Sequence, residues 1–270
     1  DTTDRNRTSP FAFTGNKFEF RMPGSSLSIS GPNFMLNTAV AESLRQFADI
    51  LEKEDDFSAG VDKLLRNTLK KHARIIFNDD NYSDEWVKEA KRRGLLNLAS
   101  TPEALPYFIA DKNIKLFETH GILTRDEVVS RYEIMLENYS KVINIEALTM
   151  LEMARQDIIP AVCEYIKLLS DETAAKKLVC ASVNCSMEEN LISALSDKLS
   201  ALFENLEELD KEVHTAHNMS GAQKAAEYYH DTVLARMEKV RGIADYMEVY
   251  TAKEYWPFPT YGDLLFSIQE

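Results

Sequence analysis

Glycine and proline are scarce in this 270-residue sequence, which holds nine and eight of them respectively. Both residues concentrate in turns, so their scarcity favours long helices over a fold of many short strands. Cysteine is rarer still: Cys163, Cys180 and Cys185 form an odd set without a Cys-x-x-Cys pair. This pattern argues against a disulfide framework and indicates free thiols in a reducing compartment, so we expect a cytoplasmic protein.

Long hydrophobic runs and an excess of positive charge are also missing. No apolar stretch approaches the roughly 18 residues of a membrane span, and no signal peptide is recognisable, so no membrane partner is expected. The 31 Lys and Arg residues face 44 Asp and Glu residues, a formal net charge of −13. Nucleic-acid phosphates require a basic surface, so this balance argues against a nucleic-acid partner. No Gly-rich phosphate loop is present either, which argues against an independent kinase-like phosphotransferase.

A short segment near the start of the chain alternates between charge and phenylalanine. In a β-strand successive side chains point to opposite faces, so Phe18 and Phe20 share one face. Lys17, Glu19 and Arg21 then share the other face at a spacing of about 6.7 Å, or two strand rises. Such a rigid row of plus, minus and plus could face phosphates and a metal ion. The alternative is a solvated cross-strand row of ion pairs without a ligand.

The residues before this segment extend the pattern. Phe-Ala-Phe at residues 11–13 alternates in the same way, and Thr-Gly-Asn at residues 14–16 supplies turn chemistry, so the two segments predict a β-hairpin. Arg-Asn-Arg-Thr-Ser at residues 5–9 adds a second group of positive charges and hydroxyls. This collection of residues suits phosphoryl transfer, which depends on positioning and on stabilising charge on the phosphoryl oxygens.

Two of these stretches, residues 5–9 and 17–21, are followed by Gly-Pro-Asn at residues 31–33, which opens a helix. Together the three stretches resemble the last part of a glutamine synthetase catalytic domain. Ser-Pro-Phe-Ala-Phe-Thr-Gly-Asn at residues 9–16, followed by a long helical tail, is similar to the large type III glutamine synthetases in particular. The rest of the chain, including Glu-Tyr-Trp-Pro-Phe-Pro at residues 254–259, resembles the type III carboxy-terminal region.

The resemblance implies a role for four residues. Glu19 resembles a ligand of a divalent metal ion, Mg²⁺ or Mn²⁺, near the transferred phosphoryl group. Arg21 resembles the arginine that holds glutamate and the acyl-phosphate intermediate, and Arg7 the arginine that stabilises the γ-phosphoryl group of ATP. Lys17 stands where the family often has an arginine for the nucleotide phosphates. The lysine keeps the charge but loses the bidentate fork of a guanidinium group.

The resemblance also implies that most of the enzyme is elsewhere. The family's other metal-binding residues, its ammonium site and its amino-terminal domain lie upstream of these motifs, and the chain begins with Asp1. We therefore expect the carboxy-terminal portion of a glutamate–ammonia ligase that uses ATP, glutamate and ammonia and forms ring-shaped homo-oligomers. The isolated chain should be inactive without its upstream catalytic region. A helical assembly or interaction module without catalysis is the alternative.

Beyond the first segment the pattern predicts a mainly α fold: a multi-helix bundle with a long C-terminal helical hairpin, preceded by the short β-hairpin. The charged cluster at residues 52–56 suggests a boundary, so we predict residues 1–55 as the end of the catalytic domain and residues 56–270 as a helical domain. The first helix should bury one face through residues at i+3 and i+4 spacing. That face comprises Leu36, Val40, Leu44, Phe47 and Leu51.

The C-terminal half contains the longest apolar periodicities. A helix from about residue 142 to residue 169 should be buried through Ile145, Leu148, Leu151, Ile158, Val162 and Ile166, with a kink at Pro160. Two further helices show the 4, 3 spacing of a coiled-coil-like pair, joined by a turn at residues 217–221. Their predicted seam residues are Leu191, Leu195, Leu199, Leu202, Leu206, Leu209 and Val213 on one helix and Val233, Met237, Val240, Ala244 and Met247 on the other.

Histidines near this turn invite a metal-site hypothesis. His214 and His217 lie three residues apart, and His230 follows on the next helix. Zinc sites on helices need further ligands and supporting hydrogen bonds, which nothing here specifies, so surface or capping histidines are the favoured interpretation. The aromatic tail at residues 254–266 is too apolar to be free and should dock on the body of the protein or on a neighbour.

Overall fold

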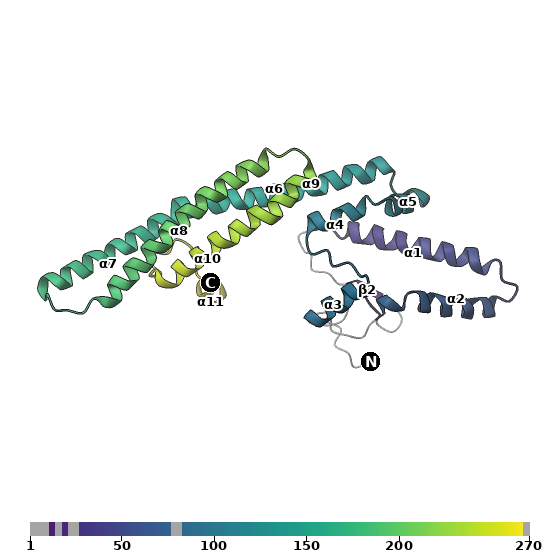
Figure 1. The fold of residues 1–270 in the computed structure, drawn as a ribbon, viewed down its shortest axis with the longest axis horizontal. Helices are drawn as coiled ribbons and strands as arrows, with labels where there is room; N and C mark the ends of the chain where they lie inside the picture. Colours follow the sequence, from purple (N-terminus) through teal and green to yellow (C-terminus); the bar gives the residue numbers. More distant parts are fainter. Residues whose placement is uncertain (1–10, 14–17, 21–26, 77–82, 267–270) are drawn as a thin grey trace. The chain divides into compact units, whose positions relative to one another are not determined.

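The computed structural model describes residues 11–13, 18–20, 27–76 and 83–266, and the chain is mainly helical within them (Figure 1). The helical fold class predicted from the scarcity of glycine and proline is therefore confirmed. Among these described residues, no helix is both long enough and apolar enough to cross a membrane.

Two three-residue strands precede the helices. Strand β1 (Phe11–Phe13) pairs antiparallel with β2 (Phe18–Phe20), with Ala12 opposite Glu19 in the register. Residues 14–17, which join the two strands, lie outside the described residues, so the β-hairpin stays a prediction. Its origin as the end of a catalytic domain stays a prediction.

The contacts within the chain divide it into two compact units. Among the described residues, the first unit comprises those up to residue 99 and residues 106–130, and the second comprises residues 100–105 and those from 131 onward. The helices on both sides of residue 55 belong to the first unit. The predicted boundary there concerns the end of a catalytic domain, and it stays a prediction.

The first unit is built from short and medium helices. Its elements are α1 (Ser30–Leu51), α2 (Phe57–Lys71), the 3₁₀ turn η2 (Ala73–Ile75), α3 (Asp84–Arg92), the end of α4 (Thr101–Phe108), α5 (Asp111–Thr119) and the start of α6 (Arg125–Met153). Side chains cap several of these helices. The Asp56 carboxylate accepts a hydrogen bond from the Ala59 N–H at 3.1 Å and caps α2. Thr124 and Glu127 form a capping box at the start of α6: each backbone N–H donates to the other side chain, at 2.8 and 3.3 Å.

Helix α1 differs from its prediction. Thr38 is its only buried residue, whereas Val40 and Leu44, expected on a buried face, are 50% and 61% exposed. Within its own unit α1 packs against α2 and α5, and the Phe34 ring lies 5.7 Å from that of Phe117. The other three residues of the predicted face, Leu36, Phe47 and Leu51, are partly buried.

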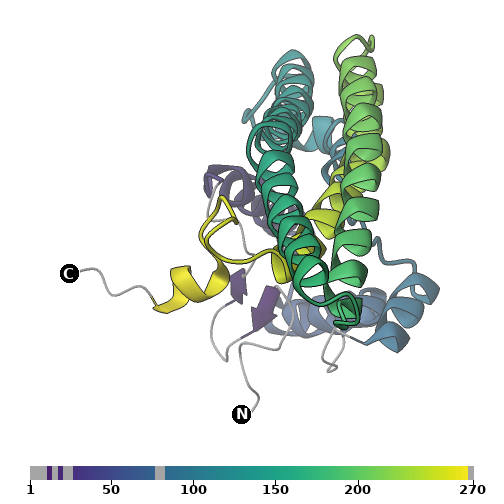
Figure 2. The ribbon, with the colours of Figure 1, turned by 90° about the vertical axis from the view of Figure 1, so that its left-hand side faces the viewer.

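The second unit is a bundle of long helices. It contains most of α6, the π-helical segment η3 (Ala154–Ile158), α7 (Ile159–Val179), α8 (Ser186–His217), α9 (Ala222–Tyr228), the π-helical segment η4 (Tyr229–Leu234), α10 (Ala235–Tyr250) and α11 (Tyr261–Phe266). Helix α8 packs against both α7 and α10, and the three lie side by side (Figure 1). Figure 2 shows α7 and α8 as adjacent columns.

The predicted helical hairpin is confirmed. Leu195, Leu202, Leu206 and Leu209 of α8 are fully buried, and α10 contributes Val240 and other apolar residues to the same core. Burying each leucine side chain contributes roughly 1.5–3 kcal/mol relative to its exposure. The turn falls between α8 and α9 as predicted, and Gly221 adopts a φ of 94°, which other residues rarely tolerate.

A third helical rod completes this core, formed by α6, η3 and α7. Ile143 and Ala147 of α6 are buried in it, whereas Ile145 and Leu148, which were expected to be buried, are 63% and 47% exposed. The prediction was wrong at these two positions because α6 carries apolar residues on two sides. Spacing alone does not say which side meets the bundle.

The interruption expected at Pro160 takes the form of a π-helical turn. The Ile159 N–H bonds to the Ala154 carbonyl five residues earlier, instead of the usual four. Pro160 has no N–H to continue the α-helical ladder, and the longer turn before it adjusts the backbone to this loss. The core continues across the turn through Ala154, Ile158 and Val162.

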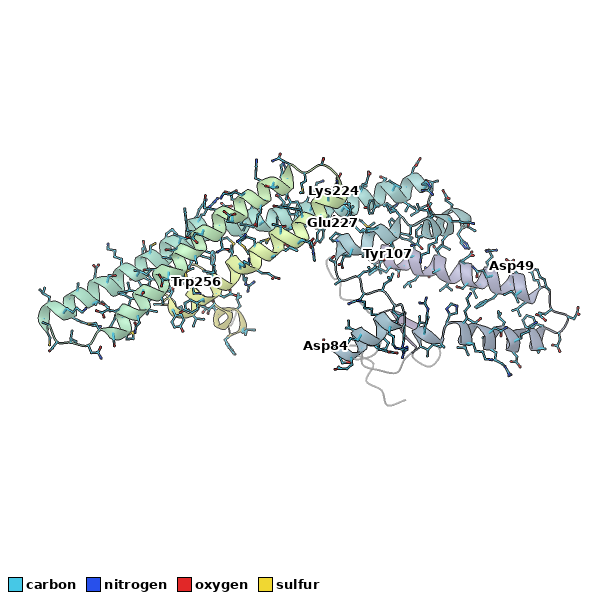
Figure 3. The ribbon with its side chains drawn as sticks, viewed as in Figure 1. Asp49, Asp84, Tyr107, Lys224, Glu227 and Trp256 are labelled. Carbon is cyan, nitrogen blue, oxygen red and sulfur yellow. The ribbon has the colours of Figure 1, made fainter. Side chains whose placement is uncertain are left out.

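The first part of the aromatic tail docks on the second unit, as predicted, whereas Leu264, Leu265 and Phe266 at its end are 65–82% exposed. Trp256 is only 9% exposed and belongs to the core of the bundle (Figure 3). The Tyr255 ring lies 5.5 Å from that of Tyr165 on α7, and Phe258 also packs against the core.

Candidate functional site

Of the four residues predicted to form a phosphoryl-transfer site, three lie outside the described residues: Arg7, Lys17 and Arg21. Glu19 lies on β2, where its backbone is opposite Ala12 of β1. The roles assigned to all four residues therefore stay predictions.

The described polar cluster nearest to these residues in sequence lies on α1. The Glu42 carboxylate accepts hydrogen bonds from Arg45 at 2.8 and 2.9 Å, from Gln46 at 2.7 Å, and contacts His120 Nε2 at 2.9 Å. The bonds from Arg45, then those from Gln46 and His120, hold the pKa of Glu42 far below its ordinary value of 4.5. His120 follows the last residue of α5, so the cluster joins α1 to α5.

Sequence reasoning missed this cluster. The i, i+3 spacing of Glu42 and Arg45 is a local signal that could have been found. The contact with His120 spans 78 residues and has no local signal. The arrangement fixes two helices together, and it contains no nucleophile.

A groove of about 430 Å³ lies between α1 and α2. Phe47, Ile50 and Leu64 contribute apolar surface to it, and Lys71 is among its polar lining residues. At its edge Lys63 pairs with Glu54 at 2.9 Å. A groove with this lining is suited to binding an apolar side chain or ligand, and its described lining residues offer no arrangement of catalytic groups.

In the second unit the polar clusters are ion pairs that join helices. Arg236 of α10 donates to Glu212 of α8 at 2.8 Å and to Asn205 at 3.0 Å. The bond to Glu212 raises the pKa of Arg236. Arg155 of η3 similarly donates to Glu207 and Asp210 of α8 at 3.0 and 2.8 Å. Each charge has a partner of opposite sign, which is the pattern of a structural network.

The histidines near the turn contact polar side chains close to them in sequence. His214 contacts Asn218 at 3.2 Å, and His230 contacts the neighbouring Asp231 at 2.7 Å. Within the described part of the chain, no group of three or more His, Cys, Asp or Glu side chains is placed to hold a metal ion. The three cysteines are free thiols, and only Cys185 is buried.

Comparison with known proteins shows what this chain is similar to. Residues 60–177 match the family described as the glutamine synthetase C-terminal domain. This matched region begins in α2 and ends in α7, and so includes parts of both units.

The similarity to individual proteins extends along the whole chain. The chain is 43% identical over its full length to a glutamine synthetase of Butyrivibrio fibrisolvens, and covers 39% of that protein. It is 37% identical over 98% of its length to the type-3 glutamine synthetase of Dictyostelium discoideum, and covers 37% of it. With a glutamine synthetase of Bacteroides fragilis (strain YCH46) the identity is 32% over 99% of the chain and 38% of the relative.

These findings confirm the resemblance to glutamine synthetases, type III included, that the sequence motifs indicated. The chain spans less than two fifths of the length of each of these curated relatives.

Proposed function

We propose that this chain is the carboxy-terminal portion of a type III glutamine synthetase. The observation that carries the proposal is the similarity along 98–100% of the chain to three proteins named glutamine synthetase, one of which is named type-3. In such an enzyme ATP phosphorylates the side-chain carboxylate of glutamate, and ammonia then displaces phosphate from the acyl phosphate to form glutamine. The parent would act in the cytoplasm as a homo-oligomer.

In this proposal the first residues of the chain complete an active site built mainly by upstream polypeptide. Arg7 stabilises the γ-phosphoryl group, Lys17 contacts the nucleotide phosphates, and Arg21 holds glutamate and its acyl phosphate. Their positive charges compensate the negative charge that develops on the phosphoryl oxygens during transfer. The half-exposed apolar face of α1, which follows this segment, supports the proposal because upstream polypeptide could cover it.

The proposed metal ligand is incomplete within this chain. Mg²⁺ prefers six oxygen ligands, usually one or two carboxylates with phosphates and waters. Glu19 would supply one carboxylate, and the described residues contain no cluster of further ligands around any such site. The residues present therefore do not by themselves fit a metal ion, and we expect the isolated chain to be inactive.

The proposal is tested in the intact parent enzyme by measuring glutamine formation from glutamate, ammonia and ATP. Glu19→Ala and Arg21→Ala should each lower kcat/KM by at least about 100-fold, because each removes a charge that acts on the transferred group. Lys53→Ala, which changes an exposed charge after α1, is the matched control and should keep full activity. Folding is checked for each variant by circular dichroism. Full activity of both site variants would refute the assignment and favour the helical module without a catalytic role.

A further inference from the structure

Helix α6 carries apolar residues on two opposite sides. Ile143, Ala147 and Leu151 face the bundle and are 0–4% exposed. At 3.6 residues per turn, a second group projects about 160° away from them. This group, the outer stripe, is 47–63% exposed and comprises Ile134, Val142, Ile145 and Leu148.

The outer stripe runs along one side of α6, with the polar residues Asn138 and Lys141 between its members. Its first and last members, Ile134 and Leu148, lie about 21 Å apart at the α-helical rise of 1.5 Å per residue. All four residues belong to the second unit. Apolar residues gathered on one face of a helix mark an interaction surface more often than isolated exposed ones do.

Two charges bracket the stripe on the same side of the helix. Arg131 precedes it and Glu152 follows it, and neither makes an ion pair with another described residue. They are 21 positions apart, so the midpoint between them falls between residues 141 and 142. The midpoint of the stripe, residue 141, is nearly the same.

This arrangement is complementary to itself in one orientation. A two-fold axis near residues 141 and 142 would place a second α6 antiparallel to the first. Each Arg131 would then face the Glu152 of the other copy, and the two stripes would cover each other. In a parallel arrangement at the same register, Arg131 would face Arg131 and Glu152 would face Glu152, which is repulsive.

We propose that the outer stripe is an isologous interface, at which two copies of this chain associate through antiparallel α6 helices. Lys141 lies close to the proposed axis, and its charge is compensated within its own helix by Glu137 at 3.6 Å. The interface rests on residues of the second unit only. It is independent of the proposed enzymatic function.

The test is the mass of the 270-residue chain in solution, measured by analytical ultracentrifugation over a series of concentrations. The wild-type chain should form a monomer–dimer equilibrium. Ile145→Asp should raise the dissociation constant of the dimer by at least about tenfold, because it introduces a charge at the apolar contact. Val249→Asp, at an aliphatic residue of α10 that is 76% exposed outside the stripe, is the matched control and should change nothing.

Charge reversal tests the orientation. Arg131→Glu and Glu152→Arg should each weaken the dimer by about 3- to 10-fold, because each places like charges at two symmetric contacts. The double variant should return to within about twofold of the wild type, because it restores both pairs with the signs exchanged. Circular dichroism establishes folding, and Ile145→Ser replaces Ile145→Asp if the latter does not fold. A chain that stays monomeric at millimolar concentration, or a dimer that the stripe variants leave intact, would overturn the proposal. A double variant whose dimer dissociates as readily as those of the two single variants would also overturn it.

Discussion

Leu202→Ala should destabilise the second unit strongly. Leu202 is fully buried in the core where α8 meets its neighbours. The substitution removes about 2.4 kcal/mol of transfer free energy, at roughly 0.8 kcal/mol for each lost methylene equivalent. The cavity left behind adds to this loss, so the free energy of unfolding should fall by about 3–4 kcal/mol. For a unit of this size the melting temperature should fall by about 6–15 °C.

The assay is urea unfolding followed by tryptophan fluorescence. The sequence has two tryptophans, Trp86 and Trp256, one in each unit. In a Trp86→Phe background the signal comes from Trp256, which packs in the same core as Leu202. Leu178→Ala is the matched control: Leu178 is 89% exposed, and its loss should cost less than about 0.5 kcal/mol. If Leu202→Ala cost no more than this control, the packing of α8 in the bundle would be wrong.

Three further predictions concern polar contacts. Arg236→Ala leaves the mostly buried Glu212 carboxylate without its guanidinium partner and should lower the free energy of unfolding in urea by about 1–3 kcal/mol. Arg241→Ala on the same helix, at an exposed ion pair, is the control and should cost about 1 kcal/mol or less. Equal losses would contradict the role assigned to burial. Glu42→Gln should lower the melting temperature at pH 7. Because the folded-state pKa of Glu42 lies below its ordinary value of 4.5, the stability contributed by its ionised form is lost as the pH falls below that value, so the difference from wild type should shrink toward about pH 3. A constant difference would show that the charge is not responsible. Thr124→Ala removes the cap of α6 and should cost about 1 kcal/mol, with Thr124→Ser close to wild type.

The sequence was sufficient where the pattern is local and long. The 4, 3 spacing along α8 predicted its buried leucines, because a helix with one apolar seam has only one way to bury it. The turn before Ala222 was found for a similar reason: it depends on residues within a few positions of each other.

Local pattern was insufficient where more than one surface could be buried. Helix α6 has two apolar sides, and the choice between them depends on the rest of the bundle core, which comes from residues far along the chain. The face of α1 at Val40 and Leu44 has the spacing of a buried surface, yet it is half exposed in this chain. In both cases the apolar spacing predicts that the helix has an apolar face, and it does not predict which part of the protein packs against that face.

The candidate site shows a similar limit. The resemblance to glutamine synthetases came from short motifs in residues 5–33, and the whole-chain similarity confirmed it. The clusters that the structure adds, such as Glu42 with His120, join residues that are far apart in sequence. Their side chains are brought together by helix packing, which the motifs do not encode.

The central claim is that this chain supplies one part of a glutamine synthetase site that other polypeptide must complete. The most direct measurement compares ATP-dependent glutamine formation by the intact parent and by the 270-residue chain, at equal concentrations and with Mg²⁺ present. We predict that the parent forms glutamine and that the chain alone forms none above background. A parent that forms no glutamine, or a 270-residue chain that forms it unaided, would contradict the account.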